Sequence, residues 1–333
     1  MTNPSPQVHP ASPSPERAPT AAGVERAQAK IAALLPETPL LPLDLPGGAT
    51  VWCKAESLQP VGAFKIRGAW HRLSDMVEAE RTRGVVAVSS GNHAQGVAWA
   101  ARRLGISATI VMPRDAPAVK LQSTAALGAQ IVLYDRMRES RDAIAAELCA
   151  RTGAILVHAY GDPWVIEGQG SAGMELAVQM ERQSGGPPTR VVCPCGGGGL
   201  TAGLALALPD AQIVPVEPEH WDDVTRSLAL GRIVGVEPAP PSTACDALQT
   251  PATFPINFAV MQARGLQGIT VTEAEVRAAQ RLAFARLRLV VEPGGAAGLA
   301  ALLAGKVSAD GRTAVILSGG NVDPASFAAV LAD

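Results

Sequence analysis

Short apolar runs alternate with helical patterns along most of the chain, and this alternation restricts the possible folds more than any other feature. The strand-like runs are ATVWCKAE, GVVAVS, SATIVMP, AQIVLYD, AILVHA, TRVVCPC, AQIVPVEP and TAVILSGG. Helical patterns separate them, for example over residues 65–80, 92–105, 118–128 and 138–151. Strands that are apolar on both faces are typical of parallel sheets covered by helices. The pattern therefore predicts an α/β protein with two open parallel sheets. A proline-rich segment without a clear period, residues 234–257, is expected to be irregular.

The composition supports a large buried core and argues against a nucleic-acid or membrane partner. Of the 333 residues, 47% are hydrophobic but only 4% are aromatic, so the core must be built mainly from aliphatic side chains. The formal net charge is −2 and there is no long basic block, which is unlike proteins that bind nucleic acid or anionic membrane surfaces. No uninterrupted apolar run approaches the roughly 18 residues that a membrane-spanning helix needs.

The N-terminal segment and the cysteines together predict a cytoplasmic protein. Residues 1–22 are rich in Pro, Ser and Ala and lack the apolar stretch of a secretory signal, so we expect a disordered tail. The five cysteines are an odd number and lie mostly in apolar runs, which favours reduced thiols over a disulfide framework.

Four consecutive glycines, Gly196 to Gly199, lie between a predicted strand and a predicted helix that begins near Leu200. Without Cβ atoms, the backbone can approach an anion closely and direct its N–H groups at it, and the helix adds the positive end of its dipole. A flexible turn is the alternative. The segment is not a G-x-x-x-x-G-K-[ST] loop, and Glu217 alone does not make a dinucleotide site. A single phosphate group is therefore the ligand that we expect.

Two further strand ends carry small polar residues that suit a ligand. In SSGNHAQG, residues 89–92 offer backbone N–H groups at a helix N-terminus, which suits a carboxylate, although an ordinary helix cap has the same sequence. The segment LSGGN, which includes Ser318 to Asn321, ends the last predicted strand. Loops at the carboxyl ends of parallel strands are where open α/β sheets bind ligands.

One lysine, Lys65, follows the segment PVGAF and opens an amphipathic helical pattern. Such a lysine is either a solvated residue of the first helical turn or a buried amine with a chemical role. A candidate phosphate site, a candidate carboxylate site and a lysine in a tight turn together favour pyridoxal phosphate as the cofactor. That cofactor needs an amine to bond it, a phosphate site and a partner for its ring nitrogen.

Together these segments resemble the fold-type II pyridoxal-phosphate enzymes of the threonine/serine dehydratase and serine racemase group. ESLQPVGAFKIRGA matches the lysine-site signature, and SSGNHAQG, CGGGGL, VEPGGAAG and LSGGNVD match four further motifs in the family's order and spacing. The resemblance implies a tryptophan synthase β-like fold with the cofactor between two α/β domains. We expect a small domain at residues 84–156, inserted in a large domain at residues 23–83 and 157–333. We also expect a homodimer.

The resemblance also implies how individual residues contact the cofactor. Lys65 would bond the cofactor, Phe64 would lie against its ring, and Asn92 would meet its 3′-oxygen. The cofactor-binding residues implied in this way are Phe64, Lys65, Asn92, Gly196, Gly197, Gly198, Gly199, Leu200, Glu292 and Ser318. Ser318 would be a neutral partner for the ring nitrogen, which weakens the electron sink and favours prompt loss of a β-hydroxyl group.

The substrate contacts follow from the same resemblance. The residues implied to hold the substrate and its α-carboxylate are Ser89, Ser90, Gly91, Asn92 and His93. Lys65 and Ser90 would be the catalytic residues on opposite faces of the substrate. Arg141 matches a position that can approach a second acidic group in racemase-like members, although an arginine on a helix is usually solvated.

The sequence departs from the family pattern at three places, and the last two, which lie near the substrate by resemblance, leave the exact substrate open. Ala63 stands where a serine is common. The segment STACDAL replaces the more usual Ala-Asp-Gly and places Cys245 and Ala247 beside Asp246. Tyr160 stands where relatives have asparagine or phenylalanine.

A divalent cation is implied by VEPEHWDDV. In racemase-like relatives such an ion is held by a glutamate, a backbone carbonyl and an aspartate, which fall on Glu217, Trp221 and Asp223. Oxygen ligands alone suit Mg²⁺ or Ca²⁺. The alternative is a solvated acidic helix start that the helix dipole stabilises.

The implied reaction is β-elimination of water from L-threonine- or L-serine-type β-hydroxy amino acids, which gives a 2-oxo acid and ammonia. A serine or aspartate racemase and a threo-3-hydroxyaspartate dehydratase are the alternatives within the family. A dinucleotide-dependent oxidoreductase would need G-x-G-x-x-G after the first strand, which is absent. A regulator without turnover is disfavoured, because Lys65, Asn92 and Ser318 are all present.

Overall fold

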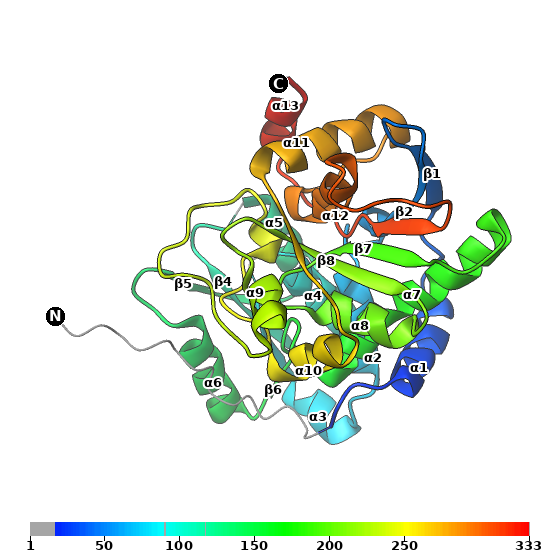
Figure 1. The fold of residues 1–333 in the computed structure, drawn as a ribbon. Helices are drawn as coiled ribbons and strands as arrows, with labels where there is room; N and C mark the ends of the chain where they lie inside the picture. Colours follow the sequence, from blue (N-terminus) through cyan, green and yellow to red (C-terminus); the bar gives the residue numbers. More distant parts are fainter. Residues whose placement is uncertain (1–16, 90, 117, 333) are drawn as a thin grey trace.

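Two separate sheets organise the chain, and helices cover them (Figure 1). The computed structural model describes residues 17–89, 91–116 and 118–332. The strands are β1 (Leu40–Asp44), β2 (Thr50–Lys54), β3 (Val85–Val88), β4 (Ala108–Pro113), β5 (Gln130–Tyr134), β6 (Ile155–Leu156), β7 (Arg190–Pro194), β8 (Gln212–Pro218), β9 (Ile269–Val271) and β10 (Thr313–Ile316). A six-stranded sheet has the order β1-β2-β10-β7-β8-β9, and a four-stranded sheet has the order β5-β4-β3-β6.

The helices connect and cover these strands. They are α1 (Ala21–Ala32), α2 (Lys65–Ser74), α3 (Glu78–Arg83), α4 (Asn92–Leu104), α5 (Ala118–Ala126), α6 (Arg141–Thr152), α7 (Pro163–Ser184), α8 (Gly199–Ala207), α9 (Asp223–Leu230), α10 (Pro255–Ala263), α11 (Glu273–Leu282), α12 (Pro293–Leu303) and α13 (Pro324–Ala332). Three short helices complete the fold: η1 (Glu56–Leu58), η2 (Asp246–Leu248) and the π-helical η3 (Ala283–Leu287).

Neighbouring strands are parallel in both sheets except for β1, which pairs antiparallel with β2. The last strand, β10, lies between β2 and β7 inside the large sheet, with Ala314 opposite both Trp52 and Val191. Its four residues are all buried, as expected for a parallel strand covered on both faces. The prediction of an α/β protein with two parallel sheets is confirmed.

All four strands of the small sheet lie between Val85 and Leu156, and the strands of the large sheet lie outside that range. The domain limits at residues 84–156 stay a prediction. The expected tail is too long at its inner end, because Arg17 forms two hydrogen bonds with Glu167 and α1 begins at Ala21. Residues 1–16 lie outside the described residues.

Helix α7 approaches two neighbouring helices closely through glycine residues. A Cβ atom on Gly168 of α7 would lie 2.5 Å from the Cα of Gly68 in α2. A Cβ atom on Gly170 would lie 2.6 Å from the carbonyl oxygen of Gly203 in α8. Glycine is therefore required where α7 meets both neighbours, and this contact fixes α2, the helix that Lys65 begins.

Several local expectations need correction or addition. The helix expected over residues 65–80 is two helices, because α2 ends at Ser74 and Val77 has an extended backbone before α3. Residues 234–257 are irregular apart from η2 and the start of α10, as predicted. All five cysteines are free thiols. Within the described residues, no helix has the length and apolar character that crossing a membrane requires.

Candidate active site

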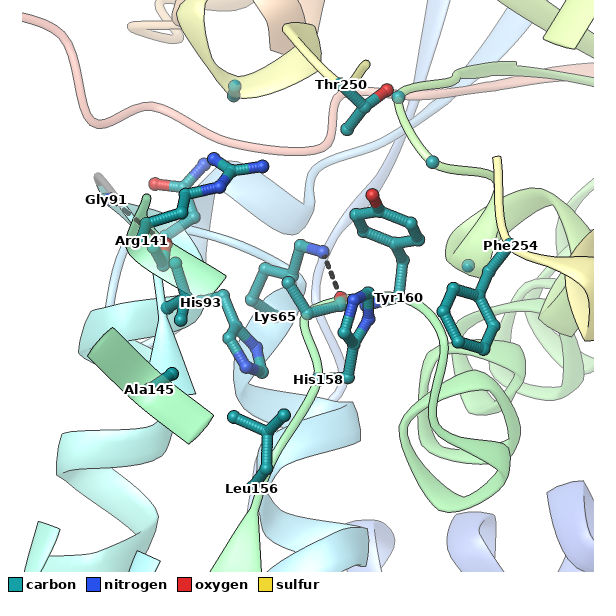
Figure 2. A pocket seen from close by; sticks show the side chains of 18 of the residues that line it. Lys65, Gly91, His93, Arg141, Ala145, Leu156, His158, Tyr160, Thr250 and Phe254 are labelled. Atoms are coloured by element: carbon teal, nitrogen blue, oxygen red, sulfur yellow. Dashed lines mark hydrogen bonds between the residues drawn. The ribbon is translucent and has the colours of Figure 1, made fainter. Parts of the chain in front are cut away.

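A cavity of about 680 Å³ lies where several strands of both sheets end (Figure 2). Its walls come from segments that follow β3, β6, β7 and β10, together with parts of α5, α6 and η2. The charged residues that line it are Lys65, Arg83, Lys120, Arg141, Asp142 and Asp246. In Figure 2, Lys65 lies between Gly91 and Arg141 on one side and Tyr160 and Phe254 on the other.

Lys65 is the first residue of α2, and its amine faces this cavity. The amine donates a hydrogen bond of 2.7 Å to the carbonyl oxygen of Ala159. Burial disfavours the charged form and lowers the pKa of Lys65 to about 8. An amine with such a pKa is neutral in a substantial fraction of molecules near pH 8, so it can act as a base.

Backbone hydrogen bonds connect the turn that precedes Lys65 to the residues that follow β10. The backbone N–H of Phe64 donates to the carbonyl oxygen of Ser318 at 3.0 Å, and Ala63 forms a β-bridge with Gly319. Gly62 has a φ of +70°, and a Cβ atom there would lie 2.4 Å from the side-chain oxygen of Asn321. The glycine is therefore needed for both the turn and the close contact.

The four-glycine segment joins β7 to α8 and forms one wall of the cavity. A Cβ atom on Gly197 would lie 2.3 Å from the Tyr160 ring, and Gly198 has a φ of +87°. The carbonyl oxygen of Gly197 accepts hydrogen bonds from Thr253 and Asn257, at 3.1 and 2.6 Å. The segment thus combines a bare backbone with the N-terminus of α8, which is the arrangement that suits a phosphate.

A second loop, from Ser89 to His93, leads into α4 on the opposite side of Lys65. The Ser89 hydroxyl accepts a hydrogen bond from the Gly91 N–H at 3.1 Å. His93 is buried, and its Nε2 lies 2.9 Å from the carbonyl oxygen of Val157. Burial, aided by the positive charge of Lys65, lowers the pKa of His93 to about 3, so this side chain is neutral. Ser90, predicted to be catalytic, lies outside the described residues.

A buried polar chain links this loop to the end of β10. The side-chain amide of Asn92 donates to Glu292, and Asn321 donates to the Asn92 side-chain oxygen at 2.8 Å. Glu292 is 1% exposed, and burial raises its pKa to about 7 even though the nearby Lys120 favours the ionised form. Asn92, Glu292 and Ser318, which the sequence placed near the cofactor, therefore lie in one region of the structure together with Asn321.

The sequence profile of the family described as "Pyridoxal-phosphate dependent enzyme" matches residues 31–319. The chain belongs to this family. It is a fold-type II pyridoxal-phosphate enzyme of the ammonia-lyase and racemase group, as the resemblance implied.

Three relatives illustrate the range of activities within that group. The chain is 42% identical over 294 residues to an L-threo-3-hydroxyaspartate ammonia-lyase from Pseudomonas sp, a match that covers 87% of this chain and 90% of the relative. The crystal structure of a threonine deaminase from T.th. superimposes with a TM-score of 0.84 at 41% identity, covering 92% of this chain and 99% of that one. Maize serine racemase superimposes with a TM-score of 0.85 at 33% identity, covering 95% and 98%.

The cavity of this pyridoxal-phosphate enzyme fits the cofactor. Gly197 leaves no room for a side chain, since a Cβ atom there would lie 2.3 Å from the Tyr160 ring, and a Cβ atom on Gly196 would lie 3.3 Å from Leu248. The Lys65 amine faces the same space as these glycines and as Ser318, which is 5% exposed. Phe64 and Leu200, at 9% and 5% exposed, also line the wall. The structure thus brings these predicted cofactor residues to one cavity; their individual roles stay a prediction.

The pyridoxal-phosphate enzyme also has two buried carboxylates at the predicted cation site. Glu217 accepts hydrogen bonds from the N–H groups of Val224 and Thr225 and from the Thr225 hydroxyl. Neither carboxylate oxygen of Asp223 has a hydrogen-bond partner within the described residues. Burial raises the pKa of Asp223 to about 7, and burial together with the Asp223 charge raises the pKa of Glu217 well above its usual value. The unsatisfied Asp223 carboxylate fits a cation there.

One buried residue of the cavity was missed in the sequence. Lys120 of α5 is 4% exposed and forms an ion pair with Asp246, which belongs to the irregular segment that connects α9 and α10. In the sequence, AVKLQSTAA gives an ordinary helical pattern in which a lysine is normally solvated. The departure STACDAL drew attention to Asp246, but nothing in the sequence pairs it with Lys120.

Proposed function

We propose that this enzyme is an ammonia-lyase that eliminates water from L-β-hydroxy amino acids and prefers L-threo-3-hydroxyaspartate. The products are the corresponding 2-oxo acid and ammonia. The observation that carries the proposal is that Arg141 lines the same cavity as Lys65 and the loop from Ser89 to His93. A substrate whose α-carboxylate lies on that loop then has a second cation within the cavity for its other carboxylate. The similarity to the L-threo-3-hydroxyaspartate ammonia-lyase from Pseudomonas sp supports this choice.

Lys65 is the residue that we assign to proton transfer at Cα. When bound, pyridoxal phosphate withdraws electrons from the substrate and makes the Cα proton acidic. The Lys65 amine, with a pKa of about 8, removes that proton. Its hydrogen bond to Ala159 gives the free amine a fixed position at the wall of the cavity.

The loop from Ser89 to His93 is assigned to the substrate carboxylate. Its position at the start of α4 directs backbone N–H groups and the positive end of the helix dipole at an anion. His93 is neutral and so contributes hydrogen bonding without charge. Ser90 is proposed to act on the face opposite Lys65, where a hydroxyl must be activated by its surroundings before it moves a proton.

Ser318, Glu292 and the glycine segment are assigned to the cofactor. Gly196 to Gly199, followed by Leu200, would hold its phosphate at the N-terminus of α8. The Ser318 hydroxyl carries no charge, so it would not keep the ring nitrogen protonated as an aspartate would. That weaker electron sink favours elimination of the β-hydroxyl group over return of the Cα proton, and hence lyase over racemase activity.

L-Threonine or L-serine is the second candidate substrate. The Asp246 carboxylate already neutralises Lys120, which reduces the positive charge of the cavity and suits a neutral side chain. The similarity to the threonine deaminase from T.th. supports the same choice. Both candidates lose water from a β-hydroxy amino acid, so they differ in specificity and not in reaction.

We also propose that Glu217, the Trp221 carbonyl and Asp223 hold Mg²⁺ or Ca²⁺, and that two copies of the chain form a homodimer. The cation would neutralise two carboxylates that repel each other in a buried position. Asp223 is the first residue of α9, so a cation there would fix the start of that helix. Its role would be structural, because Asp223 and Glu217 are absent from the cavity wall.

The test is a substrate panel with the purified holoenzyme. Release of 2-oxo acid and of ammonia is measured for L-threo-3-hydroxyaspartate, L-threonine, L-serine and D-serine, together with chiral analysis of the remaining amino acid. The expected result is the highest kcat/KM with L-threo-3-hydroxyaspartate and little racemisation. A higher kcat/KM with L-threonine or L-serine would establish the second candidate. Formation of D-serine faster than pyruvate would overturn the lyase assignment.

Ser90→Ala separates the two faces of the substrate. The variant is expected to lose racemisation and activity on D-serine while it retains part of the L-elimination, because Lys65 still removes the proton on the L face. Equal racemisation by the variant and the parent would reduce Ser90 to a helix-capping role.

A further inference from the structure

Lys120 is a buried cation at the substrate end of the cavity that the proposed reaction does not use. It lies in the first turn of α5 and is 4% exposed. A Cβ atom on Gly91 would lie 2.9 Å from its Cδ and 3.3 Å from its Nζ. The lysine side chain therefore packs directly against the loop that is assigned to the substrate carboxylate, and its ammonium group lies beside that loop.

The anion that pairs with Lys120 comes from a distant part of the chain. Asp246 forms the ion pair and belongs to η2, within the irregular segment between α9 and α10. The other carboxylate nearby is Glu292, whose Oε2 lies 3.9 Å from the Lys120 Nζ. Burial raises the pKa of Glu292 to about 7, so this carboxylate is only partly ionised at neutral pH. The direct ion pair of Lys120 is the one with Asp246.

The two members of this pair differ in how freely they can move. The Lys120 side chain is 4% exposed, whereas the Asp246 side chain is 35% exposed and belongs to a single helical turn without regular structure on either side. Asp246 can therefore rotate toward water, and Lys120 cannot. A buried ammonium group without an anion is costly, so Asp246 can leave only when another carboxylate takes its place.

We propose that the Lys120–Asp246 pair is a carboxylate-exchange site, in which the distal carboxylate of a dicarboxylic amino acid replaces Asp246 on the Lys120 ammonium group. The inference deepens the proposed function, on which it rests, by naming Lys120 as a specificity-determining residue. One carboxylate replaces another, so the buried charge remains balanced, while the released Asp246 becomes hydrated. Arg141 lines the same cavity and contributes to the positive potential that attracts the second carboxylate.

The exchange accounts for selection by the charge of the substrate side chain. A neutral side chain, such as that of serine or threonine, carries no anion for Lys120, so the Lys120–Asp246 ion pair remains intact. A second substrate carboxylate displaces Asp246 and accepts a charge-assisted hydrogen bond from Lys120. Asp246 is thus a competitor for the position that the substrate carboxylate takes, and its removal should strengthen the binding of dicarboxylic ligands.

The test uses two amino acids that lack a β-hydroxyl group and so cannot lose water. L-Aspartate and L-alanine are titrated into the holoenzyme, and binding is followed by the change in cofactor absorbance. The quantity compared is the ratio of the Kd for L-alanine to the Kd for L-aspartate, which cancels effects common to both ligands. The variants are Asp246→Asn and Lys120→Met, and Asp115→Asn is the matched control because Asp115 pairs with Arg136 at the exposed surface.

The two variants are expected to shift the ratio in opposite directions. Asp246→Asn removes the competing carboxylate, so the ratio should rise about tenfold or more, as for one hydrogen bond to a charged group. Lys120→Met removes the cation and leaves Asp246 to repel the ligand, so the ratio should fall by a similar factor. Asp115→Asn should leave it unchanged. If both cavity variants move the ratio in the same direction, or neither moves it, the proposed carboxylate exchange is wrong and the Lys120–Asp246 ion pair has only a structural role.

The outcome is separable from that of the proposed function. Should Lys120→Met fail to fold, the rise expected for Asp246→Asn decides the question alone. If the variants show the predicted shifts but the parent enzyme turns over L-threonine faster than L-threo-3-hydroxyaspartate, the proposed substrate is overturned and the exchange site stands.

Discussion

The Lys65 amine and the Ala159 carbonyl oxygen, 2.7 Å apart, join two segments that are 94 residues apart in the chain. Lys65 begins α2, which packs against α7, whereas Ala159 lies in the segment that leads from the small sheet toward α7. The hydrogen bond therefore connects the proposed base to the segment that follows the small sheet.

Lys65→Ala is expected to abolish covalent attachment of the cofactor and to lower kcat by about 10²–10⁴-fold, the usual contribution of a general base. Borohydride reduction of the parent, followed by peptide mapping, should find the cofactor on Lys65. Lys306→Ala removes a lysine that pairs with Glu275 at the surface and serves as the control. Turnover by Lys65→Ala at the parent rate would show that another group is the base.

The pKa of Lys65 predicts a pH dependence of the stability of the cofactor-free protein. Its folded pKa of about 8 lies below the ordinary 10.5, so the unfolded chain binds more protons between these values. The destabilisation by Lys65 is then complete below about pH 8 and disappears as the pH rises to about 10.5. Lys65→Met should therefore be more stable than the parent at pH 7, and the difference should shrink by pH 10.5. Urea unfolding of both proteins across this range is the measurement, and a constant difference would contradict the shifted pKa.

Gly198→Asp is expected to weaken pyridoxal-phosphate binding by about tenfold or more, because it adds a negative charge to the segment that we assign to the phosphate. Two controls isolate the cause. Gly198→Asn carries the same strain at a φ of +87° without the charge. Gly185→Asp carries charge and strain at a φ of +76° with open space around it. The cofactor Kd should increase most for Gly198→Asp; equal affinity in Gly198→Asp and Gly185→Asp would remove the phosphate site from this segment.

The order of stability of Asp223→Asn and the parent is expected to reverse when a cation is added. Without metal, the variant should have the higher Tm, because it lacks an unpaired buried carboxylate. With Mg²⁺ or Ca²⁺, the parent should gain stability by mass action and the variant should not. Thermal unfolding with chelator and with each cation measures both effects. A parent Tm that changes neither with chelator nor with added cation would show that there is no cation site.

Glu56→Gln tests the buried ion network beneath α2. Glu56 accepts two hydrogen bonds from Arg67, and although burial raises its pKa, the Arg67 charge lowers the pKa to about 2. Breaking a buried pair on one side is expected to cost about 3–5 kcal/mol. Glu37→Gln, which breaks an exposed pair with Arg182, should change the free energy of unfolding by at most about 1 kcal/mol.

The same network predicts an acid limb in the stability curve. The folded pKa of Glu56 is below its ordinary 4.5, so its stabilisation is complete above pH 4.5 and is lost as the pH falls toward 2. The parent should therefore lose more stability over this interval than Glu56→Gln does. Urea unfolding at several pH values checks this, and parallel curves would show that Glu56 contributes no acid dependence.

The sequence revealed those parts of the site that depend on local chain geometry. Gly196 to Gly199 stand out because a strand, a glycine run and a helix follow one another without interruption. Lys65 stands out because a turn-forming segment precedes it. Both features need only a few neighbouring residues, so pattern and resemblance were sufficient to locate them at the cavity.

The parts that the sequence did not reveal depend on contacts between distant segments. Lys120 looks solvated until Gly91 and Asp246 are brought to it by the fold. The strand β1 was missed because it contains Pro42, which an edge strand tolerates and a central strand does not. The helix α7 was missed because its glycines weaken the helical pattern, whereas in the structure they permit close packing against α2 and α8.

The position of β10 has a consequence for synthesis on the ribosome. Among the strands of the described residues, this one leaves the ribosome after the others, yet it lies between β2 and β7 and is followed by Ser318. The small sheet, whose strands follow one another closely in the chain, can form while translation continues. Until β10 has been synthesised, β2 and β7 of the large sheet lack the strand between them, and their exposed apolar edges need protection from aggregation. A nascent chain arrested before Thr313 should therefore contain a folded small sheet and no cofactor site.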